Sequence, residues 1–248
     1  MALTKEQIKE FKEAEAEADA ETDNFYNLKE VADNLAKTGD LEWARKVYKK
    51  AEGKAKTSDD FRFFGQSLFE KLNDKEWSLK QYKKAEDKAE YSEELYYIAR
   101  ALAEDFNDKK NATSIYKKAI EKTTDCQELG LYGWSIFKHL GDKEWADNVL
   151  NDAEKAANES SDFMYLAEQL CEMNNKEWSI RLYKKAEEQI GEEDYIGINK
   201  YMNLADELND KLADKNWAKE IYEKALKCAQ DNEEEDQIEE ISEKVKDL

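Results

Sequence analysis

A protein of 248 residues with no proline, eight glycines and 40% charged residues has the composition of a helical protein, so β-strands are not expected. The formal net charge of −20 disfavours binding to nucleic acid or to an anionic membrane, because both attract Lys and Arg. The 13 Tyr, 9 Phe and 6 Trp supply more large side chains than are found in a disordered acidic protein, and folding is expected.

The first predicted element is a helix at the start of the sequence. Thr4 and Gln7 have the spacing of a capping box, and Leu3 and Ile8 have that of a hydrophobic staple. We expect residues 1–24 to form an N-terminal capping helix that covers one end of a repeat array. The segment lacks the apolar stretch of a signal peptide, and no apolar run approaches membrane length, so the expected location is cytoplasmic.

The central feature of the sequence is a repeated motif. The stretch DKEWSLKQYKKAE at residues 74–86 returns in related form at residues 40, 108, 142, 175 and 214. We call its fourth position the Trp slot; successive slots are 34, 34, 34, 33 and 39 residues apart and hold Trp43, Trp77, Asn111, Trp145, Trp178 and Trp217. A fixed period of this length indicates a solenoid of helical hairpins. The strict spacing favours packing between repeats over stacking on nucleic-acid bases.

Each motif predicts a helix with a stripe of small residues. We number positions from the Trp slot, so that plus one is the residue directly after it. The residue at plus one is Ala or Ser, the residue at plus five is Tyr or Leu, and the residue at plus eight is always Ala. These offsets fall on one side of an α-helix. We call this stripe the seam, and we expect another helix to pack closely against it.

A helix–turn–helix joint precedes each Trp slot. Three positions before the slot stands Asp, or Asn at residue 175, and both are strong N-cap residues. One position earlier stands Gly or Asn, which favour the left-handed conformation that ends a helix. Ala213 alone departs from this pattern, at the last joint.

Upstream of the joints lies a first helix with its own pattern. Large, large, small and large residues stand at i, i+3, i+4 and i+7, as in Phe61, Phe64, Gly65 and Leu68. We call the small residue the notch. We expect the notch to receive the Ala of the second helix, so that the two helices of a repeat lock together.

These residues resemble the tetratricopeptide repeat (TPR), whose 34-residue unit has two antiparallel helices and an Ala–aromatic–Ala series on the second. The resemblance covers roughly residues 25–231, although the family's usual Pro after the second helix is absent. The half-a-TPR repeat is also similar around NWAKEIYEKAL, so the sub-family stays open.

The resemblance implies an all-α, right-handed α-solenoid of six TPR-like helix–turn–helix repeats with N- and C-terminal capping helices. The six repeats are expected at residues 25–57, 58–91, 92–125, 126–159, 160–197 and 198–231. An acidic C-terminal capping helix is expected over residues 232–248.

No group of residues predicts catalysis or metal binding. His139 is the only histidine, which excludes a site with two His ligands, and the three cysteines share no metal-ligand spacing. No nucleophile stands beside a base in a recognisable motif. We therefore expect a protein that is not an enzyme and carries no cofactor.

The resemblance also implies where a partner would bind. In the TPR family the first helices line a concave groove, and the groove positions correspond here to Arg62, Gln66, Phe69, Tyr96, Arg100, Trp134, Phe137 and Met164. Two of the four Arg in the sequence lie among aromatic residues in this set. Arg offers a planar fork to carboxylates, so the set suits a protein or peptide with an acidic or C-terminal carboxylate group.

The expected function is a non-enzymatic scaffold or adaptor for protein–protein interaction, acting as a monomer or weak homo-oligomer. Two alternatives stay open. One is a sensor that holds a small anionic or aromatic molecule against Arg62, Arg100 and Trp134. The other is structural self-assembly through the ends of the solenoid. Packing of the aromatic residues between neighbouring first helices competes with any binding role.

Overall fold

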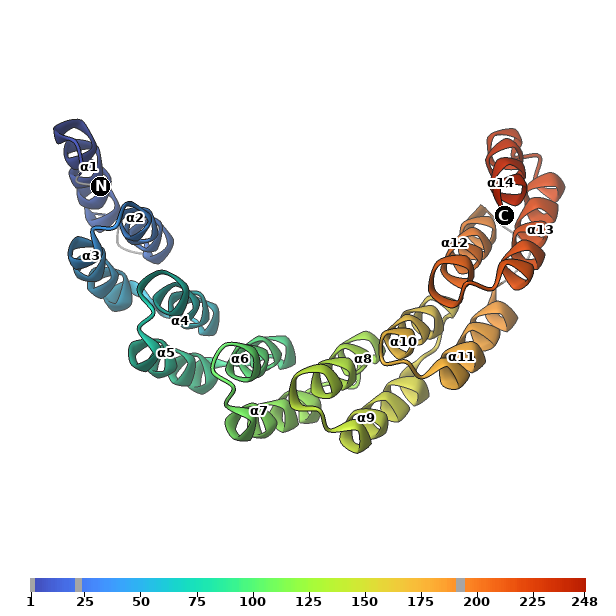
Figure 1. The fold of residues 1–248 in the computed structure, drawn as a ribbon, viewed down its shortest axis with the longest axis horizontal. Helices are drawn as coiled ribbons and strands as arrows, with labels where there is room; N and C mark the ends of the chain where they lie inside the picture. Colours follow the sequence, from blue (N-terminus) through green and yellow to red (C-terminus); the bar gives the residue numbers. More distant parts are fainter. Residues whose placement is uncertain (1–2, 21–23, 191–194) are drawn as a thin grey trace. The chain divides into compact units, whose positions relative to one another are not determined.

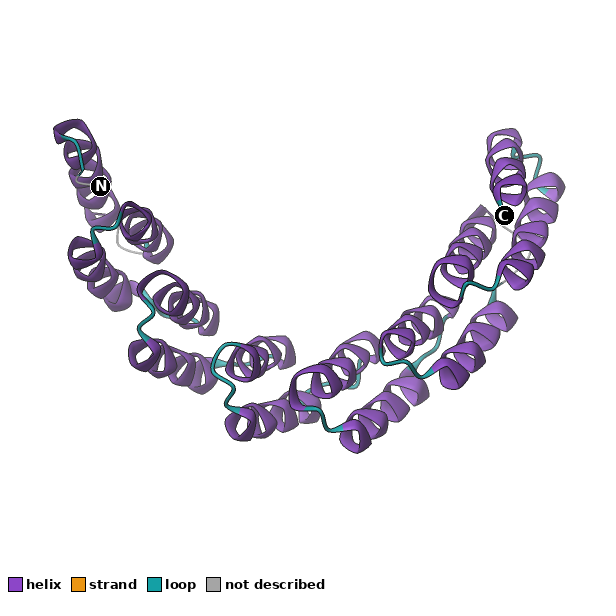
Figure 2. Ribbon diagram, viewed as in Figure 1, coloured by secondary structure: helices purple, strands orange, loops and turns teal. Residues whose placement is uncertain are grey.

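A computed structural model describes residues 3–20, 24–190 and 195–248, and all secondary structure in these ranges is helical (Figure 2). The protein divides into unit 1, Met1–Lys122, and unit 2, Thr123–Leu248. Each unit is described by itself. Residues 1, 2 and 21–23 of the predicted N-terminal helix, and residues 191–194 of the predicted fifth repeat, lie outside the described residues.

Unit 1 begins with a single helix and continues with helical hairpins. Its helices are α1 (Lys5–Ala20), α2 (Phe25–Thr38), α3 (Leu41–Lys54), α4 (Ser58–Leu72), α5 (Lys75–Lys88), α6 (Ser92–Glu104) and α7 (Lys109–Glu121). The pairs α2/α3, α4/α5 and α6/α7 pack most closely, and α4 lies between α2 and α6 (Figure 1). First helices thus form one layer of the unit and second helices the other.

Unit 2 repeats the same hairpin arrangement and ends with a single helix. Its helices are α8 (Cys126–Ser135), α9 (Lys143–Ala156), α10 (Ser160–Glu172), α11 (Lys176–Gln189), α12 (Tyr195–Leu212), α13 (Lys215–Asp231) and α14 (Glu235–Asp247). A π-helical turn, η1 (Ile136–Leu140), extends α8. The close pairs are α8/α9, α10/α11 and α12/α13, and α14 packs on α13. The prediction of an all-α solenoid is confirmed.

The joints form as the cap residues predict, with one exception. The carboxylates of Asp40, Asp74, Asp108, Asp142 and Asp214 accept hydrogen bonds of 3.0–3.2 Å from the backbone N–H of the Trp-slot residue. Asn175 stands at the N-cap of α11 but its side chain makes no capping hydrogen bond. Ala213 has a φ of 54°, so it adopts the same left-handed conformation as the Gly and Asn residues of the other joints.

The seam is the core of every hairpin. All residues at plus one, plus five and plus eight of the six Trp slots are at most 3% exposed, including Ser78 and Ser179. In α5 the Ser78 hydroxyl donates to the Gly65 carbonyl of α4 at 2.6 Å. This buried hydroxyl is therefore satisfied within its own hairpin.

The notch receives a large side chain in addition to the small residue that was predicted. A Cβ on Gly133 would lie 2.8 Å from Leu150 Cγ and 3.2 Å from the Ala146 carbonyl oxygen, and a Cβ on Gly65 would lie 3.1 Å from the Tyr82 ring. Leu150 and Tyr82 are plus-five residues. The notch therefore accommodates the large plus-five side chain together with the backbone carbonyl of the plus-one residue, which is Ser78 at Gly65 and Ala146 at Gly133.

Candidate functional site

The predicted site residues of unit 1 fall around a hollow between α4 and α6. The hollow has a volume of about 290 Å³, and we call it the α4–α6 hollow. It is lined by Arg62, Gln66, Glu70, Tyr82, Tyr97, Arg100, Ala101, Glu104 and Asp105. Three predicted residues are therefore brought together here, and the remainder of the lining was not predicted.

Arg62 is held rigidly at one wall of the hollow. Its Nε and Nη2 atoms donate to Asp59 Oδ1 at 3.0 and 2.7 Å, and its guanidinium carbon lies 4.0 Å from the Phe63 ring centroid and 4.8 Å from that of Tyr97. The side chain is only 15% exposed. Two cation–π contacts and a paired carboxylate fix the guanidinium as a flat platform.

Arg100 is the accessible cation of the hollow. Its Nε donates to Glu104 Oε2 at 3.0 Å across one turn of α6, and its side chain is 45% exposed. Exposed pairs of this kind contribute only about 0.3–0.5 kcal/mol. A carboxylate from a partner could therefore replace Glu104 on Arg100 at little cost.

Acidic groups outnumber the two Arg in the hollow. A hydrogen bond from Gln66 lowers the pKa of Glu70, which keeps that carboxylate anionic. Burial raises the pKa of Asp105. With Glu104 included, three carboxylates face two guanidinium groups. The hollow thus offers contacts to cationic as well as anionic groups of a ligand.

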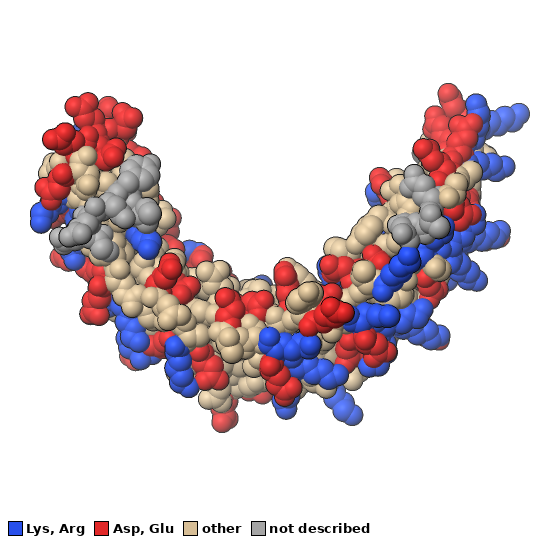
Figure 3. Space-filling view, turned by 180° about the vertical axis from the view of Figure 1, so that it is seen from behind, with Lys and Arg blue, Asp and Glu red and all other residues tan. Residues whose placement is uncertain are grey.

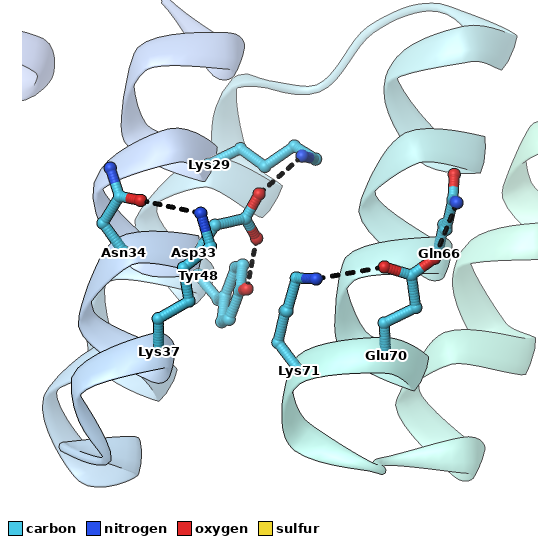
Figure 4. A network of polar contacts seen from close by, with 8 residues as sticks. All are labelled: Lys29, Asp33, Asn34, Lys37, Tyr48, Gln66, Glu70 and Lys71. Carbon is cyan, nitrogen blue, oxygen red and sulfur yellow. Dashed lines mark hydrogen bonds and ion pairs between the residues drawn. The ribbon is translucent and has the colours of Figure 1, made fainter.

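Polar groups on the first helices also pair with one another, on α2 outside the hollow and on α4 at its wall (Figure 4). Lys29 donates to Asp33 at 2.8 Å within α2, and the Tyr48 hydroxyl of α3 donates to the same carboxylate. Gln66 donates to Glu70 at 2.7 Å within α4. Burial, together with the hydrogen bond to Asp33, raises the pKa of Tyr48. These pairs anchor polar side chains on the faces of α2 and α4.

Two predicted residues of unit 1 lie elsewhere. Tyr96 is only 2% exposed and packs against Tyr97 and Tyr116, with ring centroids 5.2 and 6.2 Å away, so it is a core residue rather than a surface one. Tyr97, one position further along α6, lines the hollow in its place. Phe69 packs on Phe106 with ring centroids 4.8 Å apart, and it is not part of the lining.

The predicted residues of unit 2 occupy two places. Trp134 meets the His139 ring edge-on at 6.0 Å, under Lys138 Nζ at 4.2 Å, and Phe137 lies half-buried in the neighbouring π-helical turn. Met164 lines a separate hollow of about 390 Å³ between α10 and α12, which also includes Glu207. Burial raises the pKa of Glu207 to about 7.

The Trp slots carry a contact between repeats that sequence reasoning missed. The Trp77 indole N–H donates to Glu52 Oε2 at 3.1 Å, and Lys84 Nζ lies 2.6 Å from the other carboxylate oxygen. Equivalent contacts join Trp178 to Glu154 at 2.6 Å, Trp217 to Glu187 at 3.0 Å and Trp43 to Glu15 at 2.7 Å. We call this the Trp–Glu contact, and it confirms that these Trp residues pack between repeats.

The signal for this contact was present in the repeat alignment. Glu recurs nine positions after the Trp slot at residues 52, 86, 154 and 187, while residues 120 and 226 are Ile and Leu. Where the next slot is Asn111, Glu86 keeps the contact with the Lys seven positions after that slot, Lys118, at 2.6 Å. Lys and Arg side chains gather along the side of unit 1 formed by its second helices α3 and α5 (Figure 3).

Among the described residues, no group of three or more His, Cys, Asp and Glu is arranged to hold a metal ion. None of the described helices is long and apolar enough to cross a membrane.

Paired helices that recur with a period near 34 residues, with buried seams and capped joints, define a TPR-like helical repeat protein. No protein-family model matches the sequence, and no curated protein matches it. The protein is similar to a solved structure of the C-terminal part of a TPR repeat-containing protein from Cytophaga hutchinsonii, at 18% identity, over 90% of this protein and 89% of that one, with a TM-score of 0.46. A circular tandem repeat protein with novel repeat topology aligns with 98% of this protein and 60% of its own length, at 14% identity and a TM-score of 0.21.

Proposed function

We propose that the protein is a non-enzymatic scaffold and that the α4–α6 hollow binds a peptide segment of a partner protein. The observation that carries this proposal is the arrangement of the two Arg residues. Arg62 is fixed between Phe63 and Tyr97, and Arg100 stands exposed beside it on the next first helix. A flat, preorganised surface beside an exchangeable cation suits recognition of an extended segment.

The charges of the hollow define the chemistry of the segment. A carboxylate of the ligand, from an acidic residue or from the C-terminus of the peptide, displaces Glu104 from Arg100. The carboxylates of Glu70, Glu104 and Asp105 then favour a Lys or Arg in the same segment. The proposed ligand therefore carries both charges, and its binding weakens as salt is added.

The test compares two Arg residues of nearly equal exposure. Arg100 is 45% exposed and paired with Glu104, and Arg45 on α3 is 46% exposed and paired with Asp74. A partner captured by the intact protein should bind the Arg100→Ala variant at least tenfold more weakly, about 1.4 kcal/mol, because the displacing carboxylate has lost its receptor. The Arg45→Ala variant should bind normally.

A partner whose affinity is unchanged by Arg100→Ala would refute the assignment of the hollow. The Trp134→Ala variant makes the corresponding measurement in unit 2. A loss of affinity there and not at Arg100 would move the binding surface to α8 and its π-helical turn. Circular dichroism of each variant checks that the fold is unchanged.

A further inference from the structure

Helix α1 has the residue pattern of a second helix. Aligning Glu6 with the Trp slot places Phe11 at plus five, Ala14 at plus eight and Glu15 at plus nine. Glu15 accepts the Trp43 indole N–H at 2.7 Å and pairs with Lys50 at 2.9 Å. These are the two contacts that Glu52 makes with the following repeat. Helix α1 therefore stands where the second helix of a preceding repeat would stand.

The seam of α1 lacks the covering that the other seams have. In the hairpins the plus-five and plus-eight residues are at most 3% exposed, and the plus-five residues Tyr82 and Leu150 lie against the notch of the first helix in their own repeat. In α1, Phe11 and Ala14 are only half-buried. They line a hollow of about 350 Å³ with Glu17 and Ala18 of the same helix. We call it the α1–α2 hollow.

The opposite wall of this hollow is the face of α2 that would meet a preceding first helix. It is formed by Asn27, Glu30, Val31 and Asn34. Glu30 and Val31 have the positions of Phe63 and Phe64 in α4, which face the preceding repeat: Phe63 meets Tyr26 with ring centroids 6.2 Å apart, and Phe64 meets Phe25 at 6.1 Å. Both walls of the α1–α2 hollow are thus surfaces that hold a first helix elsewhere in unit 1.

We propose that the α1–α2 hollow binds one amphipathic helix of a partner protein, in the position of a repeat's first helix. Its apolar stripe has large, large, small and large residues at i, i+3, i+4 and i+7, to match the seam. Glu17 and Glu30 line the hollow, and none of the described lining residues is Lys or Arg. The helix therefore carries Lys or Arg beside its apolar stripe.

A second copy of the protein fits this hollow less well. Helix α14 has the apolar pattern in Ile238, Ile241, Ser242 and Val245, but the residues beside it include Glu235, Asp236 and Glu239. These would lie against the acidic lining of the hollow. Moreover, Glu6 and Glu13 replace the Trp and Lys that would receive a Glu from a preceding second helix. Like charges at both places disfavour stacking of copies.

The probe for this site is a fluorescent peptide taken from the protein's own first helices. It has the sequence of residues 92–104, with Glu93, Glu94 and Glu104 replaced by Lys. The residue at 93 has the position of Tyr26 in α2, which meets the next first helix, so its Lys is expected to face Glu30. Fluorescence anisotropy with the full-length protein should show at least tenfold tighter binding than for the unmodified peptide.

Matched variants separate the hollow from the rest of unit 1. Ala14→Phe fills the hollow and should weaken binding of the Lys peptide at least tenfold, whereas Ala16→Phe, on the exposed side of α1, should leave it unchanged. Glu30→Lys should make the unmodified peptide bind more tightly than the Lys peptide. Because Glu30 is exposed, this substitution does not require the fold to accommodate a larger side chain, as Ala14→Phe does. Arg100→Ala should have no effect, which distinguishes this site from the α4–α6 hollow.

Two results would overturn the proposal. The first result is that neither Ala14→Phe nor Glu30→Lys changes the affinity for the Lys peptide, which would place the binding site of the peptide elsewhere on the protein. The second result is that a peptide of residues 232–248 binds more tightly than the Lys peptide and that the full-length protein has a doubled mass in solution. These observations together would assign the hollow to a second copy.

Discussion

The Trp–Glu contact can be tested at Glu154, whose carboxylate is only 10% exposed. It accepts the Trp178 indole N–H at 2.6 Å, Arg181 Nη2 at 2.8 Å and Lys185 Nζ at 2.7 Å. Arg181 and Lys185 are themselves exposed, so each pair contributes about 0.5–1 kcal/mol, and the hydrogen bond from Trp178 to the carboxylate contributes about 1.5 kcal/mol. Glu154→Ala should therefore lower the free energy of unfolding by about 2.5–3.5 kcal/mol. Glu154→Gln, which keeps an acceptor for the indole, should cost about 1–2 kcal/mol.

The assay is urea unfolding followed by circular dichroism, with amide hydrogen exchange of α11 as a local readout. Glu188→Ala, at an exposed position of the same helix, is the control and should change stability by less than about 0.5 kcal/mol. Equal unfolding curves for Glu154→Ala and Glu188→Ala would show that the contact does not join the repeats.

The pH dependence of the Glu154 variants provides a second readout. Burial raises the pKa of Glu154, but hydrogen bonds from Lys185 and Trp178 outweigh it and hold the pKa below its ordinary value of 4.5. A carboxyl group whose pKa is lower in the folded protein than in the unfolded one stabilises the fold at any pH above its unfolded pKa. This stabilisation is lost as the pH falls through the pKa of the folded protein. The difference between the parent protein and Glu154→Gln should therefore shrink below about pH 4.

Three further predictions concern single positions. Ala213→Gly should stabilise the protein by about 0.5–1 kcal/mol in urea unfolding, because Ala213 holds a φ of 54° that Gly adopts without strain; a loss of stability would contradict the strained joint. Ala153→Leu should destabilise by about 1–3 kcal/mol by overpacking the seam, while Lys155→Leu, at an exposed site of the same helix, should have little effect; a neutral Ala153→Leu would mean that the seam is loose. Glu207 has a pKa raised to about 7 by burial, so stability should fall as the pH rises from about 4.5 to 7. Glu207→Gln should remove this fall, leaving the variant about 1–3 kcal/mol more stable at pH 8, and an unchanged pH profile would place the carboxylate in water.

The repeat register follows from interactions between near neighbours in the sequence. An Asp three residues before the Trp slot reaches the slot's N–H through the geometry of the first helical turn, which is independent of the rest of the fold. The seam is equally local, because plus one, plus five and plus eight share one side of any α-helix. Asn175 shows the limit of this reasoning, since its type predicts a capping bond that its side chain does not make.

The sequence did not predict which individual side chains of the first helices are exposed at the surface. Tyr96 and Tyr97 both flank the apolar positions Leu95 and Ile98, so periodicity leaves either one free to turn inward. The packing of α6 against its neighbours decides the matter, burying Tyr96 and leaving Tyr97 in the hollow beside Arg62. An error of one position rotates a side chain by about 100° around a helix, which is enough to exchange core and surface.

The sequence by itself determined the helical class, the positions of the joints and the buried seams of this protein, because each depends on residues within a few helical turns of one another. Only the tertiary structure decided the contacts between repeats. Glu154 and Trp178 are 24 residues apart, and Glu15 and Trp43 are 28 apart, so each pair meets only after successive helical layers have stacked. The second-helix role of α1 likewise depends on stacking, because Glu15 meets Trp43 and Lys50 only when α1 lies beside the first hairpin.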